Sequence, residues 1–270
     1  MKNLAVIGKP SDWLIASSVD YDEAKKFGVN IIDVDIKELE EASLAHIEEP
    51  LPGDFPPSFN KEETRKAYQI YMGLKDLVSK YDLSGLTVRC FDLLSSLKST
   101  SCLGFALLNA EGIIATCEGD VPSMLSMFLV RETLNKSAFQ ANPSRIQTDT
   151  GEVIFAHCTL PLDMCSSYSF MTHYESGIGI GVRGRLMERK ILIFRMDRYL
   201  KRFVLLSGDI EQNLALENLC RSQIQVKVDG DVTYFLKRPL GNHHIIVYGE
   251  RKEAETLSNR LKELGLERVS

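Results

Sequence analysis

The pattern of apolar residues changes once along this chain of 270 residues, at about residue 140. Before that point, short apolar runs of strand length alternate with longer stretches of helical composition. Such alternation predicts an open, mostly parallel sheet with flanking helices, the α/β class. After that point, short strand-like runs follow one another with only turn residues between them. We therefore expect an α/β part at 1–145 and a β-rich part, mixed or antiparallel, at 146–270.

Turn and cap residues place the elements within this frame. Asn60 is the expected N-cap of a long helix, and Gly28 is the expected end of a shorter one. Four of the eight residues from 50 to 57 are proline, which excludes a helix or a central strand there. The strands of the first part are expected at 4–7, 29–34, 86–91 and 113–117, and its helices at 18–27, 36–49, 61–80, 101–109 and 121–135. The second part is expected to hold strands at 153–157, 167–174, 191–195, 202–207, 224–228 and 244–248, and a last helix at 252–264.

Charge and cysteine usage exclude several classes of function. The net charge is −5 and both signs are spread along the chain, so no basic face favours nucleic acid or an anionic membrane. No apolar segment approaches the roughly 20 residues that span a bilayer, and the first apolar run is too short for a signal peptide. The six cysteines form no CxxC pair and several lie in apolar runs, which is typical of a reducing compartment. We expect a soluble, cytoplasmic protein.

An acidic turn, Cys117-Glu118-Gly119-Asp120, follows an expected strand and precedes an expected helix. The carboxyl ends of strands in open α/β sheets are where ligands bind. Glu118 and Asp120 could hold a hard cation such as Mg²⁺ or Mn²⁺; alternatively, Asp120 only caps the helix and Glu118 faces water. Asp92 ends another strand and is expected to share the crevice. Carboxylates so close together need a cation or a raised pKa to coexist.

The histidines are the second group of candidates. His243 and His244 precede an apolar run, and because neighbours on a strand face opposite sides, at most one of them enters a given site. Imidazole favours Mn, Fe, Ni or Zn over Mg, although on the residues alone a surface turn histidine is a slightly better explanation of the pair. His173 and Glu175 share one strand face, and His157 ends an apolar strand; His173 and His157 can each be an ordinary core or rim histidine.

Two other patterns carry no chemistry. The glycine-rich segment 177–184 is followed by no P-loop Lys-Ser/Thr and lacks a strand-turn-helix context, so we interpret its glycines as turns or bulges of the β-rich part. Met124 and Met127 are expected to pack in a helix core. No serine elbow or Cys-His spacing indicates nucleophilic catalysis.

Five segments, in the same order along the chain, resemble the L-fucose isomerase and L-arabinose isomerase superfamily, in particular its shorter fucose-isomerase-like proteins. They are Gly8-Lys9-Pro10-Ser11-Asp12-Trp13-Leu14-Ile15-Ala16-Ser17, Cys90-Phe91-Asp92, Cys117-Glu118-Gly119-Asp120, Ala156-His157-Cys158 and Gly241-Asn242-His243-His244. The resemblance implies an α/β domain followed by a β-barrel-like domain. It also implies a Mn²⁺-dependent aldose–ketose isomerase that moves a proton between C1 and C2 of a sugar through an enediol.

The resemblance also implies roles for individual residues. Asp120 and His243 match motif positions of metal ligands, and Glu118 lies in the same motif. Asp92 would be the remaining catalytic carboxylate, although the family has a glutamate one position later, where this chain has Leu93. Substrate contacts are expected from residues in or near the matching segments, namely Trp13, His157, His173 and Glu175. The chain matches from its first residues, so we expect the family's extra N-terminal domain to be absent, and by analogy we expect a homo-oligomer.

These observations leave more than one function open. A metal-dependent sugar isomerase explains the acidic turn together with Asp92 and His243. A catalytically degenerate carbohydrate-binding or assembly protein on the same scaffold explains Leu93 and the absent domain. A different metal-assisted reaction, such as an aldol cleavage through the same enediolate, is also compatible with these residues.

Overall fold

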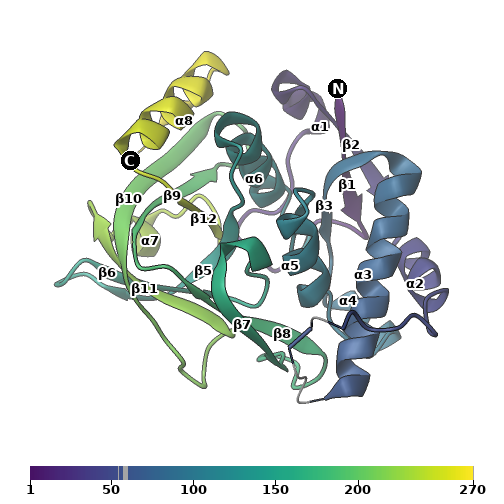
Figure 1. Cartoon of the computed structure of the whole chain (residues 1–270). Coiled ribbons are helices and arrows are strands. Elements are labelled where there is room, and N and C mark those ends of the chain that lie inside the picture. Colours follow the sequence, from purple (N-terminus) through teal and green to yellow (C-terminus); the bar gives the residue numbers. More distant parts are fainter. Residues whose placement is uncertain (54, 57–59, 270) are drawn as a thin grey trace.

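The computed structural model describes residues 1–53, 55–56 and 60–269, which form an α/β part and a β-barrel packed side by side (Figure 1). The expected loop at 50–57 includes Asp54 and Pro57, which lie outside the described residues; its other residues form no helix or strand. In the described part of the chain, no helix is both long and apolar enough to cross a membrane.

The α/β part is built on a sheet of four parallel strands in the order β2-β1-β3-β4. Its strands are β1 (Lys2–Ile7), β2 (Val29–Val34), β3 (Leu83–Val88) and β4 (Ile114–Thr116). Their continuous apolar runs are explained by burial, because helices cover the sheet and leave few strand side chains in water.

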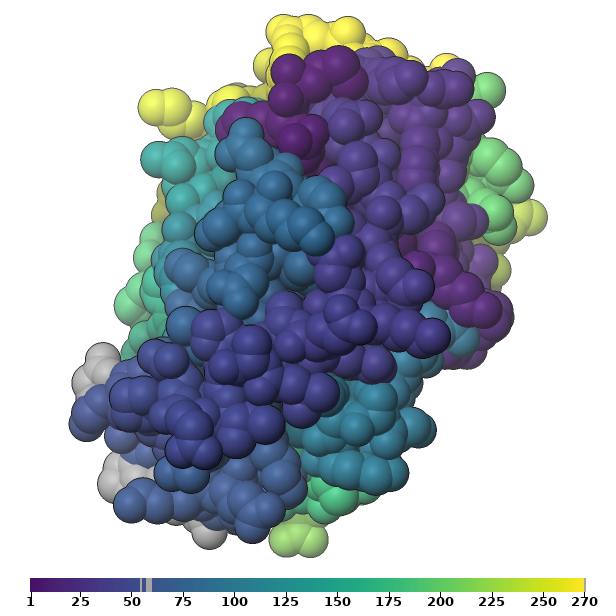
Figure 2. Space-filling view, turned by 90° about the vertical axis from the view of Figure 1, so that its right-hand side faces the viewer, coloured from purple at the N-terminus to yellow at the C-terminus, as the bar shows by residue number. Residues whose placement is uncertain are grey.

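The helices of this part begin and end where the sequence provides caps. The Asn60 side chain accepts the backbone N–H groups of Glu62 and Glu63, as predicted, and Gly28 ends the first helical segment with a φ of 78°. The helices are α1 (Tyr21–Ala24) with a 3₁₀ turn at Lys25–Phe27, α2 (Ile36–Leu44), α3 (Lys61–Tyr81), α4 (Asp92–Ser96), α5 (Cys102–Ala110) and α6 (Val121–Leu134). Seen from the side, these N-terminal residues form most of the face opposite the barrel (Figure 2).

Helix α6 is the element that joins the two parts. Every residue from Val121 to Val130 is buried, and Met124 and Met127 pack into a core shared with strands of both parts, as predicted. A helix that is apolar on all sides is one buried on all sides. The acidic turn at its N-terminus is therefore fixed between the sheet and the barrel.

Six antiparallel strands close the barrel, because β11 pairs with β6 on one side and with β10 on the other. The strands are β5 (Phe139–Gln147), β6 (Glu152–His157), β9 (Lys190–Met196), β10 (Arg202–Asn213), β11 (Ser222–Asp229) and β12 (His244–Tyr248). A separate hairpin, β7 (Cys165–Thr172) and β8 (Ile180–Leu186), follows a 3₁₀ turn at Leu162–Met164, and the C-terminal region adds α7 (Tyr234–Lys237), α8 (Arg251–Glu263) and the short β13 (Glu267–Arg268).

The structure bears out an α/β part followed by a β-rich part, and makes the second a closed antiparallel barrel. The barrel begins with β5 at Phe139, ahead of the expected change of part at residue 145. Strands β5 and β8 are not among the strands expected from the sequence. The glycine-rich segment expected to form turns or bulges contains most of β8, and its first residues connect β7 to β8.

Candidate functional site

The acidic turn Cys117–Asp120 connects β4 to α6 through two consecutive left-handed residues. Glu118 has a φ of 63° and Gly119 a φ of 59°. A Cβ atom on Gly119 would lie 2.6 Å from the Lys9 carbonyl oxygen, so the position requires glycine. This backbone sends the side chains of Glu118 and Asp120, two residues apart, into different surroundings.

Contacts from both parts of the molecule hold the turn in place. The Gln140 side chain, from barrel strand β5, accepts the Cys117 N–H at 2.7 Å and donates to the Cys117 carbonyl at 3.3 Å. The Ser11 hydroxyl donates to the Glu118 carbonyl from the loop after β1. The turn is therefore positioned by the whole fold and not by its own strand alone.

Asp120 is completely buried and its carboxylate has four donors. Oδ1 caps α6 by accepting the Ser123 N–H at 3.0 Å, and also accepts Arg195 Nη2 at 3.1 Å. Oδ2 lies 2.8 Å from Arg195 Nη1 and 2.8 Å from His243 Nδ1. Burial raises the pKa of this carboxyl, but the charge of Arg195 and the contact with His243 outweigh it and hold the pKa well below its usual range. The roles of metal ligand and catalytic group that we expected of Asp120 differ from this arrangement, in which each of its two oxygens already has two contacts within the protein.

Arg195 holds these groups together from barrel strand β9. Its side chain is completely buried. Besides Asp120, its guanidinium donates to the Ser123 hydroxyl, to the His243 carbonyl and, at 2.9 Å, to the Ala16 carbonyl. Arg195 therefore ties the loop after β1, the start of α6 and the segment before β12 to one point.

Glu118 faces a cavity and lies opposite two histidines. Its Oε1 lies 3.4 Å from His243 Nε2 and 3.8 Å from His157 Nε2. Each imidazole is oriented by its other nitrogen: His243 Nδ1 contacts Asp120, and His157 Nδ1 lies 3.1 Å from the Thr159 hydroxyl. Such outer partners fix the tautomer and direction of metal-binding histidines.

Glu118 and the two histidines shift one another's pKa values. Burial raises the pKa of the Glu118 carboxyl, but the close contacts and charges of His157 and His243 outweigh it and hold that pKa far below its usual value. For His243, burial lowers the pKa, but the two carboxylates beside it outweigh burial and raise the pKa to about 9. Burial lowers the pKa of His157. The group is a carboxylate flanked by two imidazoles that differ in basicity.

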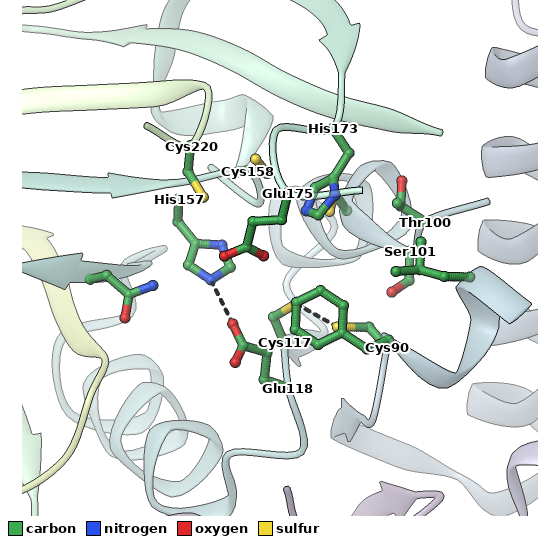
Figure 3. Close-up of a pocket in the computed structure, with 14 residues that line it drawn as sticks. Cys90, Thr100, Ser101, Cys117, Glu118, His157, Cys158, His173, Glu175 and Cys220 are labelled. Atoms are coloured by element: carbon green, nitrogen blue, oxygen red, sulfur yellow. Dashed lines mark hydrogen bonds and ion pairs between the residues drawn. The ribbon is translucent and has the colours of Figure 1, made fainter. Parts of the chain in front are cut away.

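The cavity is closed on its other side by the connection between β7 and β8 (Figure 3). His173 and Glu175 lie on this connection, and the Glu175 carboxylate points toward Glu118 and His157. Burial and the charge of Glu118 raise the pKa of Glu175, and burial lowers the pKa of His173 to about 4. Cysteine thiols form much of the remaining wall.

Trp13 and His244 lie on different sides of the site. Trp13 covers one edge of the site, where its Nε1 donates to Glu118 Oε2 at 2.9 Å. His244 points away into the barrel, where its Nε2 lies 3.1 Å from the Tyr234 hydroxyl. His243 and His244 thus point to opposite sides of the strand, as strand alternation leads one to expect. Glu118, His157, His173, His243, Glu175 and Trp13 are brought together.

Asp92 is not brought to this cavity. Its side chain is 41 % exposed, pairs with Arg89 Nε at 3.3 Å and lines a separate surface hollow beside Gly8 and Lys9. Leu93, at the position where the resemblance led us to expect a glutamate, is completely buried in the core. The expectation that Asp92 shares a crevice with the acidic turn therefore differs from the structure, because Asp92 pairs with Arg89 at the surface.

Two features of the site are missing from the sequence predictions. One is Arg195, whose signal is a charged residue inside the apolar run Ile191–Met196. The other is the gathering of cysteines that lie far apart in the sequence around one cavity. Three of them, Cys90, Cys117 and Cys158, follow strands, which is the only local signal they share.

The chain has distant relatives among named enzymes. It is 22 % identical over 279 residues to a protein named sulfoquinovose isomerase from Priestia aryabhattai, covering 93 % of this chain and 60 % of that protein. It is 22 % identical over 284 residues to a protein of the same name from Clostridium sp. (strain MSTE9), covering 94 % of this chain and 61 % of that protein. The chain thus spans about 60 % of the length of these relatives. No family model matches it.

Proposed function

We propose that this protein is an aldose–ketose isomerase acting on a sugar or sugar derivative at the cavity between the α/β part and the barrel. The observation that carries the proposal is the convergence of His157 Nε2 and His243 Nε2 on one Glu118 carboxylate oxygen. The distant similarity to proteins named as isomerases supports the same class of reaction.

The residues of the site fit a divalent cation. His243 Nε2 is buried and has no hydrogen-bond partner among the residues that the structure describes. Two imidazoles and a carboxylate are a donor set that suits Mn²⁺, Fe²⁺, Co²⁺ or Zn²⁺. Glu118, His157 and His243 would hold the cation, which as a Lewis acid stabilises negative charge on sugar oxygens. Asp120 would act behind His243, by fixing its orientation.

Glu175 is our candidate for moving the proton. Isomerisation removes a proton from the carbon next to a carbonyl and returns it to the neighbouring carbon, through an enediol of the sugar. A carboxylate performs this best when its pKa is raised, as burial does for Glu175. Glu175 thereby takes the base role expected of Asp92, which lies outside the cavity.

His173 lines the cavity and Trp13 lies at its edge, so these rings are our candidates for contact with a sugar. The His173 ring is buried and oriented by Nδ1, which lies 2.9 Å from the Ser176 hydroxyl. The Trp13 ring lies edge-on to Phe91 with their centroids 5.5 Å apart. An aromatic wall excludes water on one side and leaves the polar groups to select hydroxyls.

The proposal also covers the ancestry, the cellular location and the oligomeric state of the enzyme. We propose common ancestry with the L-fucose and L-arabinose isomerase superfamily, supported by the five resembling segments and by the α/β part followed by a barrel. A cytoplasmic, homo-oligomeric enzyme is part of it, supported by the free cysteines and by that resemblance.

A second candidate is a sugar-binding protein without catalysis on the same scaffold. It is favoured by Leu93, which buries an apolar side chain where the family has a glutamate. Exchange of a sugar proton with solvent distinguishes the two functions.

The test incubates the protein in D₂O with Mn²⁺, Co²⁺ or Zn²⁺ and a panel of aldoses and ketoses that includes sulfoquinovose. NMR then follows ketose formation and deuterium at C1 and C2. We expect deuterium incorporation that Glu175→Gln and Glu118→Gln abolish and that the surface variant Glu255→Gln leaves unchanged. Sugar binding without any exchange would favour the second candidate, and neither binding nor exchange would overturn both.

A further inference from the structure

The cavity beside Glu118 is lined by five of the six cysteines of the chain, all of them free thiols. They come from five different loops and elements and are Cys90, Cys102, Cys117, Cys158 and Cys220. The sixth, Cys165, does not line the cavity and contacts the Pro161 carbonyl instead. Nothing in the isomerisation proposed above uses a thiol.

Cys117 is a thiol that lies close to two of the candidate cation ligands. One ligand atom from each of Cys117, Glu118 and His157 can be chosen such that all three lie within 4.8 Å of one another. Bond lengths of about 2.0 Å to nitrogen or oxygen and about 2.3 Å to sulfur let one ion reach three such atoms after small side-chain rotations.

The position of the Cys117 sulfur is fixed on several sides. Gln140 holds both backbone polar groups of Cys117. The Cys90 sulfur lies 3.0 Å from the Cys117 sulfur and can serve as its hydrogen-bond partner. Both thiols are buried, as is His157. A buried, preorganised sulfur next to a carboxylate and an imidazole is a mixed soft and hard donor set.

We propose that Cys117 is a ligand in this cavity, so that the site selects a thiophilic divalent cation of the Zn²⁺ or Cd²⁺ class over Mg²⁺ or Mn²⁺. The inference rests on the proposed function, because it concerns the cation of the same site. On binding, the Cys117 S–H bond breaks, its proton passes to the buffer and the sulfur bonds to the cation, with no change of oxidation state.

The types of ligand atom explain why the site would prefer Zn²⁺ or Cd²⁺. Carboxylate and water suffice for Mg²⁺ and Mn²⁺, whereas thiolate and imidazole together favour Zn²⁺ and its heavier analogue Cd²⁺. Most nitrogen and oxygen sites also prefer Zn²⁺ to Mn²⁺, so relative affinity alone does not establish a sulfur ligand. The test must therefore detect the metal–sulfur bond itself.

The first experiment titrates Cd²⁺ into the purified, reduced protein and records the ultraviolet charge-transfer band of a cadmium–thiolate bond. We expect one band that saturates at one Cd²⁺ per chain. Cys117→Ser is expected to lose the band and at least about 100-fold in Cd²⁺ affinity, the upper end of what outer partners of a metal contribute. Cys165→Ser is the matched control and keeps both.

The second experiment needs no variant and so does not depend on whether Cys117→Ser folds. X-ray absorption of the zinc-loaded, unaltered protein is expected to show one sulfur at about 2.3 Å together with lighter atoms at about 2.0 Å. A shell of nitrogen and oxygen alone would overturn the sulfur ligand.

The outcomes separate this inference from the proposed function. Cd²⁺ binding that Glu118→Gln abolishes, with no thiolate band, would overturn the role of Cys117 and leave the cation site standing. A band that persists in Cys117→Ser would overturn it too, since another cysteine would then be the ligand. Failure of the protein to bind Cd²⁺, Zn²⁺ or Mn²⁺ at all would remove both proposals.

Discussion

Glu118 and Asp120 are two carboxylates in one turn, and the structure gives them opposite surroundings. Asp120 is completely buried and accepts from Arg195, His243 and the start of α6, whereas Glu118 is 13 % exposed and faces the two imidazole Nε2 atoms across 3.4 and 3.8 Å. Both oxygens of Asp120 are thus occupied by contacts within the protein. The Glu118 carboxylate faces the cavity and can still bind a ligand. The difference shows that the chemical type of a side chain and its position in a motif do not fix its role; its remaining bonding capacity does.

The largest expected effect on the free energy of unfolding comes from removing Arg195, the cation that pairs with Asp120. Arg195→Met leaves Asp120 buried without its cation, so we expect a loss of about 3–5 kcal/mol in the free energy of unfolding, measured by urea denaturation. The exposed variant Arg251→Met is the control and is expected to show no resolvable loss. A loss from Arg195→Met below about 1 kcal/mol would contradict the stabilising role of the Arg195–Asp120 pair.

Asp120→Asn sharpens the comparison, because it keeps the shape and removes the charge. We expect a loss of about 1–3 kcal/mol from the weakened contacts with Arg195. Zn²⁺ affinity, measured by calorimetry, is expected to fall about 10- to 100-fold, since His243 loses the partner that orients it. Unchanged affinity would show that Asp120 stabilises the fold without serving the site.

Gly119→Ala tests the turn that separates the two carboxylates. The new methyl group would meet the Lys9 carbonyl in a left-handed backbone, so we expect a loss of about 1–3 kcal/mol and weaker Zn²⁺ binding. Gly28→Ala is the matched control, because Gly28 is also left-handed but has open space where its Cβ would lie. Equal losses in the two variants would mean that the contact with Lys9 is unimportant.

The smallest expected effect is that of Asp92→Asn. Asp92 lies on the surface beside Arg89, so we expect unchanged Zn²⁺ affinity and unchanged deuterium exchange into the sugar. A loss of exchange comparable to that of Glu175→Gln would restore Asp92 as the base and contradict its exclusion from the cavity.

Much of the fold could be predicted because its strands are continuous apolar runs and its helices carry caps such as Asn60. Strand β5 escapes prediction because Pro143 and polar residues interrupt it, which the barrel tolerates at a register shift between Pro143 and Arg145. Strand β8 could not be predicted, because its glycines indicate turns in a sequence. Gly181 and Gly184 instead allow Cys158 and Cys165 to pack closely against the strand.

The site could be predicted only in part. The acidic turn and the opposite directions of His243 and His244 follow from strand ends and strand alternation. The division between Glu118 and Asp120 depends on the left-handed backbone at Glu118, a conformation that glycine and, less strongly, Asn or Asp indicate in a sequence but glutamate does not. Arg195 and the cysteines reach the site through tertiary contacts of high sequence separation, which local patterns do not encode.

The central claim is that Glu118, and not Asp92, holds a cation together with His157 and His243. The most direct test is calorimetric titration of Zn²⁺ into the unaltered protein, Glu118→Gln and Asp92→Asn at one pH and ionic strength. We predict one site per chain in the unaltered protein and in Asp92→Asn, and no measurable binding in Glu118→Gln. Binding that survives in Glu118→Gln, or that disappears in Asp92→Asn, would contradict the account.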